Sequence, residues 1–249
     1  MLNISSYDLL ASVYDALGLG QHSLQLAQVL SILYTKPGRA LDLCCGTGLA
    51  AQLLAQQGWQ VTAVDQSSAM LDIARARARD SMTHIEYILD DARDLDHVHG
   101  HFDLITCFGD SLAELEEVAD LHECLSTLAQ HLKPQGLLAF DMRRKSMYEH
   151  WDAYSEVLHD DHALLAYVER DYVARDQLAS HRYVWFMREI DLWWREESTI
   201  DTRFYDDSAL NIALQQAGLH IMSRLNLHGQ AAHENEEWVL FLVRLSEKA

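Results

Sequence analysis

The stretch from Ala40 to Leu54, ALDLCCGTGLAAQLL, constrains the fold more than any other part of this 249-residue chain. An apolar run of strand-forming residues leads into two closely spaced glycines, and a helix-forming segment follows. Glycine adopts backbone conformations that other residues avoid, so the chain can turn sharply here and leave its backbone open to a ligand. The stretch predicts a strand, a turn that holds a small molecule, and a helix.

The alternation of strands and helices continues beyond this unit. The segments WQVTAVD, HIEYIL, FDLITCF and LLAFDM predict four more strands. Helical segments lie between them, including SAMLDIARARARD, which Ser67 would cap, and the run from Leu112 to Leu132. Because right-handed crossovers place helices over a parallel sheet, this order predicts such a sheet with helices on both faces. Ligands bind such sheets at the carboxyl ends of the strands.

The flanking segments have a different texture. Apolar residues at helical spacing predict one or two helices over residues 5–34, and aromatic and β-branched residues over 163–205 predict three or four antiparallel strands. We therefore expect one α/β domain built on a doubly wound, seven-stranded, mostly parallel sheet. Its expected parts are an N-terminal helical lid (1–35), a cofactor-binding core (36–142), an antiparallel β insertion (143–205) and a return to the core sheet (206–249).

Charge and composition restrict the partners. The chain has 38 acidic and 19 basic residues, a formal net charge of −19, which repels phosphate backbones and anionic membranes. The start of the chain has no signal-peptide pattern, no apolar stretch reaches membrane-spanning length, and the cysteines show no C-x-x-C spacing. We expect a cytoplasmic monomer or homodimer that acts on a small molecule, without nucleic-acid or membrane partners.

Two cofactor classes fit the glycine turn. Gly46, Gly48 and Ala51 match the G-x-G-x-x-A spacing of a dinucleotide-binding turn, which favours a nucleotide-dependent oxidoreductase or epimerase. Asp42, on the strand before the turn, favours the other class, because a carboxylate there works against a pyrophosphate at the helix N-terminus. S-adenosylmethionine carries an ammonium, a sulfonium and no phosphate, so this acid would have a cationic partner.

Acids at the ends of the next two strands strengthen the second choice. Asp65 ends the second strand, where a carboxylate accepts ribose hydroxyls from either cofactor. Asp91 and Ala92 follow the third strand, where an acid would accept the adenine amino group and a small neighbour would leave room for the ring. Acids closing three successive strands are a more specific signal than the glycines alone.

With these residues in place, the chain resembles the class I S-adenosylmethionine-dependent methyltransferases over nearly its whole length. LDLCCGTG resembles the first family motif, and YDLLASVYDAL resembles the N-terminal lid of the small-molecule branch. VTAVDQS, ILDDARDL, FDLITCFGDSL and LKPQGLLAFDM resemble the ribose, adenine, active-site and fifth-strand segments. The resemblance implies S-adenosylmethionine as cofactor and S-adenosylhomocysteine as product.

The resemblance also assigns cofactor residues. These are Tyr14 on the lid, Asp42, Cys44, Gly46 and Gly48 at the methionine end, Asp65 and Gln66 at the ribose, Met70, Asp91 and Ala92 at the adenine, and Cys107 at the centre. Position 44 is often glycine in the family, and some sugar-amine N-methyltransferases carry a histidine where this chain has Gly109 to Glu114.

Methyl transfer is an in-line displacement, so positioning does most of the work and an alcohol or phenol acceptor also needs a base. The catalytic candidates are Tyr7, which would orient the acceptor, and the acids Asp110, Glu114 and Asp141; Arg143 or Arg144 would hold a substrate carboxylate. N-methylation is slightly favoured over O-methylation, and no metal site is expected at the histidines of 97–101. The alternatives are the oxidoreductase or epimerase, a non-catalytic S-adenosylmethionine-binding module, and a methyltransferase acting on macromolecules.

Overall fold

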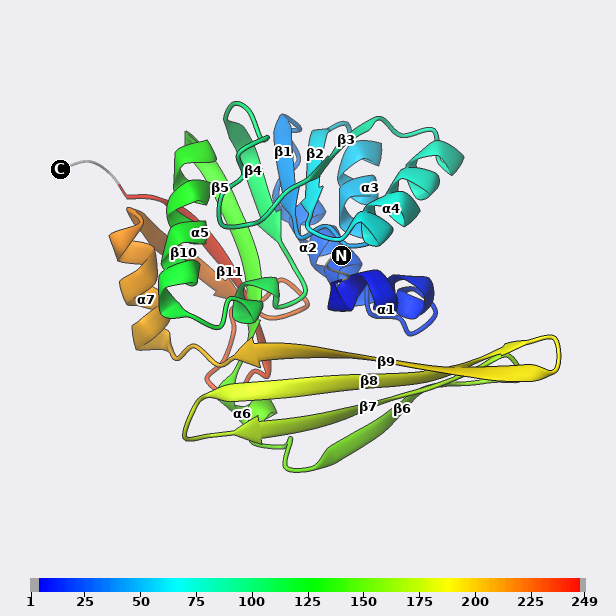
Figure 1. Ribbon diagram of the computed structural model, residues 1–249. Coiled ribbons are helices and arrows are strands. Elements are labelled where there is room, and N and C mark those ends of the chain that lie inside the picture. Colours follow the sequence, from blue (N-terminus) through cyan, green and yellow to red (C-terminus); the bar gives the residue numbers. More distant parts are fainter. Residues whose placement is uncertain (1–4, 247–249) are drawn as a thin grey trace.

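Seven strands form the central sheet of the computed structural model, which describes residues 5–246 (Figure 1). Their order is β10-β11-β5-β4-β1-β2-β3; β1 to β5 run parallel, and β11 pairs antiparallel with both of its neighbours, β5 and β10. The strands are β1 (Arg39–Leu43), β2 (Gln60–Asp65), β3 (Ile85–Leu89), β4 (Phe102–Cys107), β5 (Leu132–Arg143), β10 (Leu219–Leu225) and β11 (Trp238–Leu245). The predicted doubly wound, mostly parallel sheet is confirmed.

Helices cover both faces of this sheet because its strands are apolar on both sides. In β5, Leu138 and Phe140 face one helical layer, while Leu137 and Ala139 face the other. One layer is α5 (Val118–His131) with α7 (Asp207–Gln216), and the other is α2 (Gln21–Leu33) with α3 (Leu49–Gln56). Helix α4 (Ser68–Asp80) packs beside α3, and Ser67 caps it as predicted by accepting the backbone N–H of Met70.

A second sheet lies below the first (Figure 1). It contains four antiparallel strands in sequence order: β6 (Tyr154–Asp160), β7 (Leu164–Val173), β8 (Leu178–Glu189) and β9 (Leu192–Arg203), reached through the short helix α6 (Lys145–Tyr148). Helix α1 (Ser6–Tyr14) packs on this sheet, with Leu10 and Val13 against Val168 and Trp185. The predicted antiparallel insertion is therefore present, and the N-terminal helix rests on it.

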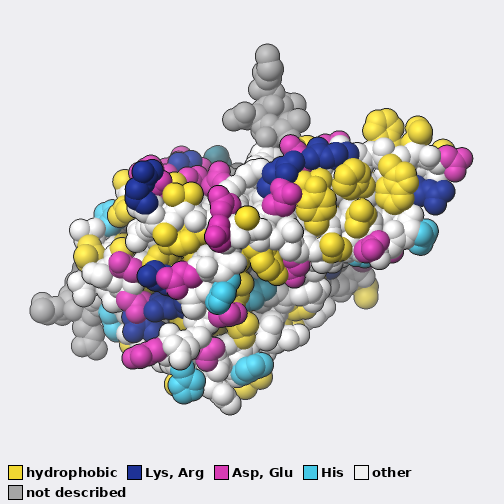
Figure 2. All heavy atoms as spheres, turned by 90° about the horizontal axis from the view of Figure 1, so that it is seen from below, with side chains coloured by type: hydrophobic (Ala, Val, Ile, Leu, Met, Phe, Trp, Pro, Cys, Tyr) yellow, Lys and Arg dark blue, Asp and Glu magenta, His cyan; other side chains and the backbone are white. Residues whose placement is uncertain are grey.

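The far end of the second sheet leaves apolar side chains uncovered. Hydrophobic side chains gather on the sheet seen from below (Figure 2), and Leu192, Trp193 and Trp194 are 64%, 50% and 53% exposed. No helix among residues 5–246 is long and apolar enough to span a membrane.

The predicted helix from Leu112 to Leu132 is wrong in its first part. The chain forms a 3-10 turn, η1 (Ser111–Glu114), and α5 begins only at Val118. The break is caused by residues distant in sequence, because the carbonyl of Leu115 accepts a hydrogen bond from the hydroxyl of Tyr205, and the carbonyl of Glu116 accepts one from Nε of Arg203. These carbonyls are thus bound by side chains from the end of β9 and the residues just after it, instead of by a continuing helix.

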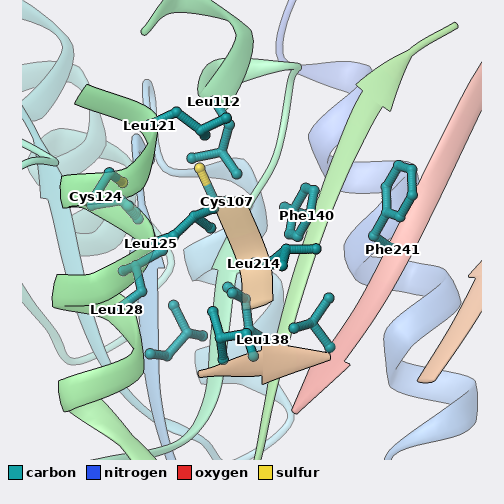
Figure 3. Close-up of a cluster of buried hydrophobic side chains, with 14 of the residues drawn as sticks. Cys107, Leu112, Leu121, Cys124, Leu125, Leu128, Leu138, Phe140, Leu214 and Phe241 are labelled. Atoms are coloured by element: carbon teal, nitrogen blue, oxygen red, sulfur yellow. The ribbon is translucent and has the colours of Figure 1, made fainter. Parts of the chain in front are cut away.

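The layer formed by α5 and α7 offers a test of the packing. Leu138 is fully buried among Cys107, Leu125 and Leu214 (Figure 3). We expect Leu138→Ala to lower the free energy of unfolding by about 2–5 kcal/mol, from lost burial and the cavity left behind. Ile212→Ala, at a helix position that is 52% exposed, is the control, with an expected change below about 0.5 kcal/mol. Urea unfolding measures both, and equal losses would contradict the packing described.

Candidate active site

A cavity lies where the carboxyl ends of β1 to β4 meet; we call it the strand-end cavity. Each strand end contributes a wall, as does the lid helix α1. The lining residues used below are Tyr7 and Tyr14 from α1, Cys44 and Gly46 after β1, Asp65 and Gln66 at the end of β2, Asp91, Ala92 and Arg93 after β3, and Gly109 and Glu114 after β4. This is the edge at which parallel α/β sheets bind ligands.

The glycine turn has the backbone conformation that its sequence predicts. Gly46 and Gly48 have φ angles of 53° and 79°, and a Cβ at Gly48 would lie 2.9 Å from the Cβ of Ala74. Cys44 also has a positive φ, 54°. The cysteine therefore keeps the left-handed conformation at the position where the resembling family often has glycine, and the turn keeps its shape.

The carboxyl group of Asp42 is buried directly before this turn. It is 2% exposed; Oδ1 accepts the hydroxyl of Thr106 at 2.7 Å, whereas Oδ2 has no hydrogen-bond partner within the described chain. Burial raises the pKa of Asp42 to about 7, and the nearby charge of Asp65 acts in the same direction. An unpaired carboxylate oxygen in this position suits a cationic group and opposes a phosphate.

Asp65 shapes the turn as well as the cavity wall. Its Oδ2 accepts the backbone N–H of Gly46 at 2.8 Å, and its Oδ1 accepts that of Ser67 at 2.9 Å. Burial raises the pKa of Asp65, and these two N–H donors oppose the rise. The carboxylate is therefore held in a fixed orientation beside Gln66.

Asp91 is paired in a way that the sequence reasoning missed. Arg93 donates from Nε and Nη2 to the two carboxylate oxygens, at 2.9 and 2.6 Å, and these hydrogen bonds hold the pKa of Asp91 below its usual range. The sequence Asp91-Ala92-Arg93 places an arginine two residues after the acid, and this spacing could have indicated the pair. Arg93 thus joins Asp91 and Ala92 on the cavity wall.

The lid helix closes the cavity through a hydrogen bond from Tyr7 to Glu114. The Tyr7 hydroxyl donates to Oε1 of Glu114 at 2.5 Å. Burial raises the pKa of Glu114 to about 8, opposed by this hydrogen bond, and burial also raises the pKa of Tyr7. Tyr14 lines the cavity beside Tyr7, with their ring centroids 6.4 Å apart.

Two acids fasten the lid helix to the core. Near its start, Asp8 accepts the hydroxyl of Ser67 at 2.6 Å. At its end, Asp15 accepts the hydroxyl of Thr47 in the glycine turn at 2.7 Å and pairs with Arg77. The lid is therefore fixed to the β1 turn and to the N-terminus of α4.

A second cavity adjoins the first beneath the lid; we call it the lid cavity. Tyr7, Tyr14, Gly109 and Glu114 line both cavities, so the two spaces meet at these residues. The rest of its wall includes residues that sequence reasoning did not select: His22 from α2, His181 and Tyr183 from β8, and Trp238 from β11. No local pattern in the sequence marks them, because they come from three separate elements, α2, β8 and β11.

Arg143 lines the lid cavity, and the carboxylate of Asp110 balances the charge of its guanidinium group. Nη1 donates to Asp110 at 2.7 Å, and the group lies over the rings of Trp238 and Trp151, 4.5 and 5.3 Å from their centroids. Arg144, the other predicted carboxylate-binding residue, pairs instead with Asp207 at 2.5 and 3.0 Å. Of these two arginines, Arg143 lines the lid cavity and Arg144 lines neither cavity.

Several predicted site residues lie behind the cavity walls. Cys107 is fully buried in the core between the sheet and α5, and Met70 is 1% exposed on the inner side of α4. Asp110 and Asp141 are 1% and 0% exposed, because they bind Arg143, Tyr148, His22 and backbone N–H groups. The predicted catalytic and cofactor residues that line neither cavity are Asp42, Gly48, Met70, Cys107, Asp110 and Asp141.

The comparisons with known proteins agree with this geometry. Residues 40–136 match a family described as "Methyltransferase domain". These residues therefore form a methyltransferase domain, and the predicted enzyme class, an S-adenosylmethionine-dependent methyltransferase, is confirmed. S-adenosylmethionine is the cofactor of this enzyme class, as predicted.

Individual relatives resemble this methyltransferase along most of its length. "Putative methyltransferase YqeM" of Bacillus subtilis (strain 168) is 27% identical over 86% of this chain and 87% of its own. An S-adenosylmethionine-dependent methyltransferase from Clostridium acetobutylicum ATCC 824 has a TM-score of 0.83 at 23% identity, covering 96% of this chain and 99% of that one. The sugar N-methyltransferase KedS8 from Streptoalloteichus sp ATCC 53650 has a TM-score of 0.73 at 18% identity, covering 92% and 88%.

The raised pKa of Glu114 predicts a pH-dependent stability. Between the ordinary pKa of 4.5 and about 8, the folded protein keeps a proton that the unfolded chain has lost, so stability falls as pH rises through this window. In Glu114→Gln, the side-chain amide oxygen can still accept the hydrogen bond from the Tyr7 hydroxyl, and the amide group does not titrate. We expect it to gain about 1 kcal/mol or more over the parent above pH 8, and much less near pH 4.5.

Unfolding in urea at several pH values measures this difference. Glu123→Gln, an exposed position on α5, is the control, and its difference from the parent should stay flat with pH. A flat profile for Glu114→Gln as well would contradict the buried, protonated state of Glu114.

Proposed function

We propose that the protein transfers a methyl group from S-adenosylmethionine to a nitrogen or oxygen atom of a small acceptor, with nitrogen favoured. One observation carries the proposal: the strand-end cavity and the lid cavity meet at Tyr7, Tyr14, Gly109 and Glu114. The first cavity lies at the sheet edge, and its wall carries the glycine turn and the acids Asp65 and Asp91, which suit a cofactor. The second offers an adjoining space for an acceptor, closed by the same lid.

The residues present fit this cofactor. When bound, it supplies a methyl group on a positively charged sulfur. The buried, half-unpaired carboxyl of Asp42 suits its ammonium end, acting through the turn at Cys44 and Gly46. Asp65 and Gln66 would hold the ribose, and the segment from Asp91 to Arg93 would hold the adenine. Gly48 would let the turn lie close to α4, because it has no side chain. Met70 and Cys107 are buried and would support the cavity walls from behind.

The chain's own groups then orient the acceptor and exclude water. The pair formed by Tyr7 and Glu114 stands where the cavities meet, so it can hold the acceptor's nucleophile by hydrogen bonds. Tyr14 and Tyr183 add aromatic walls, and the lid fastened by Asp8 and Asp15 keeps the site closed. Asp110 supports the site by holding Arg143.

Charge favours an amine over an anionic acceptor. The charge of Arg143 is balanced by Asp110, whereas the carboxyl of Glu114 stands at the meeting point of the cavities. An amine brings N–H donors, and the oxygen atoms of a carboxyl group accept hydrogen bonds from them. The net charge of −19 favours the same class of acceptor. A hydroxyl acceptor is the alternative, and the cytoplasmic location and the monomer or homodimer stay predictions.

Cofactor binding is the first test. We expect calorimetric titration to show one site for S-adenosylhomocysteine and no binding of NADH or NADPH. Asp65→Ala should weaken binding by about a hundredfold, because a charged acceptor of hydrogen bonds is lost. Asp72→Ala, an acid on α4 with a 78% exposed side chain, is the control and should bind like the parent. Binding of a nicotinamide cofactor instead would replace this proposal by the oxidoreductase.

The role of Tyr7 is tested by methyl transfer from labelled S-adenosylmethionine into a cell lysate. We expect the label in the small molecules that cross a dialysis membrane. Tyr7→Phe should lower the rate of methyl transfer about tenfold or more, because the hydroxyl that binds Glu114 is lost. Its affinity for S-adenosylhomocysteine should stay within about twofold of the parent, since no cofactor contact is removed. Tyr154→Phe, at a 40% exposed position, is the control. Label found only in protein, or an unchanged rate, would count against the small acceptor or against Tyr7.

A further inference from the structure

A histidine and an aspartate form a pair at the wall of the lid cavity. His22 in α2 lines the cavity, and its Nε2 lies 2.9 Å from Oδ2 of Asp141 at the end of β5. The imidazole lies against the ring of Trp238, with centroids 4.0 Å apart, and its side chain is 20% exposed. The ring is thus held on one side by an aromatic face and at one nitrogen by a carboxylate, and the side chain remains accessible.

Asp141 fixes which ring nitrogen carries the hydrogen. It is fully buried, its Oδ1 accepts the backbone N–H of Gly109 at 2.8 Å, and its Oδ2 accepts that of Asp110 at 3.2 Å. Both oxygens therefore already act as acceptors, and the imidazole donates to the carboxylate from Nε2. In the neutral ring this leaves Nδ1 with a free lone pair, which is the state of a proton acceptor.

The pair lies close to the place where the reaction would occur. Gly109 lines both cavities, and its N–H binds Asp141, which binds His22. The imidazole is thus two hydrogen bonds away from a residue at the meeting point of the cavities. On the same wall, Tyr7 and Glu114 flank this point from the lid and from η1.

The other titratable groups of the lid cavity are less suited to take a proton. Glu114, with its pKa raised to about 8 by burial, already holds one at neutral pH. Arg143 is bound to Asp110, and the tyrosines Tyr7, Tyr14 and Tyr183 all have raised pKa values through burial. His181 is buried against Thr202, and burial together with Arg143 and Arg170 lowers its pKa well below the usual range.

We propose that His22 is the catalytic base of the methyl transfer and that Asp141 is its positioning residue. The inference rests on the proposed function, which it extends to an acceptor that carries an N–H or O–H group. A lone pair of the acceptor forms the bond to the methyl carbon, and the electron pair of the broken carbon–sulfur bond stays on sulfur. The proton of the acceptor moves to Nδ1 of His22, and the resulting imidazolium stays paired with Asp141 until solvent removes the proton.

Nitrogen NMR of histidine-labelled protein tests the pair without knowledge of the acceptor. The parent is compared with His22→Gln, which identifies the His22 signals, in the free state and with S-adenosylhomocysteine. At neutral pH we expect His22 to carry its hydrogen on Nε2 in both states. Diethyl pyrocarbonate should modify His22 in both states and leave the buried His181 unmodified, as an internal control.

Asp141→Asn separates positioning from general structure. Its amide would donate to Nε2, so we expect the Nε2–H signal of His22 to be lost and the hydrogen to move to Nδ1. If this variant does not fold, the parent spectra still decide, because a hydrogen on Nδ1 in the parent, or a His22 that S-adenosylhomocysteine shields from modification, overturns the proposal. The free-protein spectra are readable even if S-adenosylhomocysteine does not bind, so a failure of the proposed function is seen separately.

Discussion

Buried carboxyl groups at the carboxyl edge of the central sheet are the constraint on which the rest of the structure depends. Four of them are at most 9% exposed: Asp42, Asp65, Asp110 and Asp141. A carboxylate removed from water is costly unless it accepts hydrogen bonds or pairs with a cation, and burial raises its pKa. The chain must therefore supply donors at this edge, and the shapes of its loops follow from how it does so.

Most of those donors are backbone N–H groups, which ties each acid to one loop conformation. Asp65 accepts a hydrogen bond from the backbone N–H of Gly46 and thereby holds the glycine turn against the end of β2. Asp141 accepts hydrogen bonds from the backbone N–H groups of Gly109 and Asp110. It thereby fixes the start of η1, where the two cavities meet. Asp42 keeps one oxygen without a partner in the described chain, and burial raises its pKa to about 7, so protonation lowers the cost of burying it. The conformations of the loops at this edge are thus set by the acids buried there.

Local patterns in the sequence predicted the sheet and much of the strand-end cavity. The strand, glycine turn and helix from Ala40 to Leu54, the cap at Ser67 and the acid at Asp65 are all encoded within a few residues of one another. The antiparallel insertion was predicted as well, because aromatic and β-branched residues dominate it. These features depend on backbone propensity and on residue spacing, both of which a sequence displays directly.

Features that depend on distant contacts could not be predicted. The break before α5 follows from Tyr205 and Arg203 binding carbonyls far away in sequence. The pair of His22 with Asp141 joins α2 to β5, and nothing near His22 in the sequence distinguishes it from the other histidines. The sequence marked acids such as Asp110 as catalytic candidates, but only the packing showed that Asp110 lies behind the cavity walls.

A crystal structure of the complex with S-adenosylhomocysteine tests the central claim most directly, namely that one lid covers a cofactor at the strand ends and an acceptor beside it. We predict the ribose at Asp65, the adenine next to Ala92, and the amino group on the side of Asp42. The sulfur should face the junction of the two cavities at Tyr7 and Glu114. A ligand bound in reverse, with its adenine in the lid cavity, or one that leaves the strand-end cavity empty, would contradict the account.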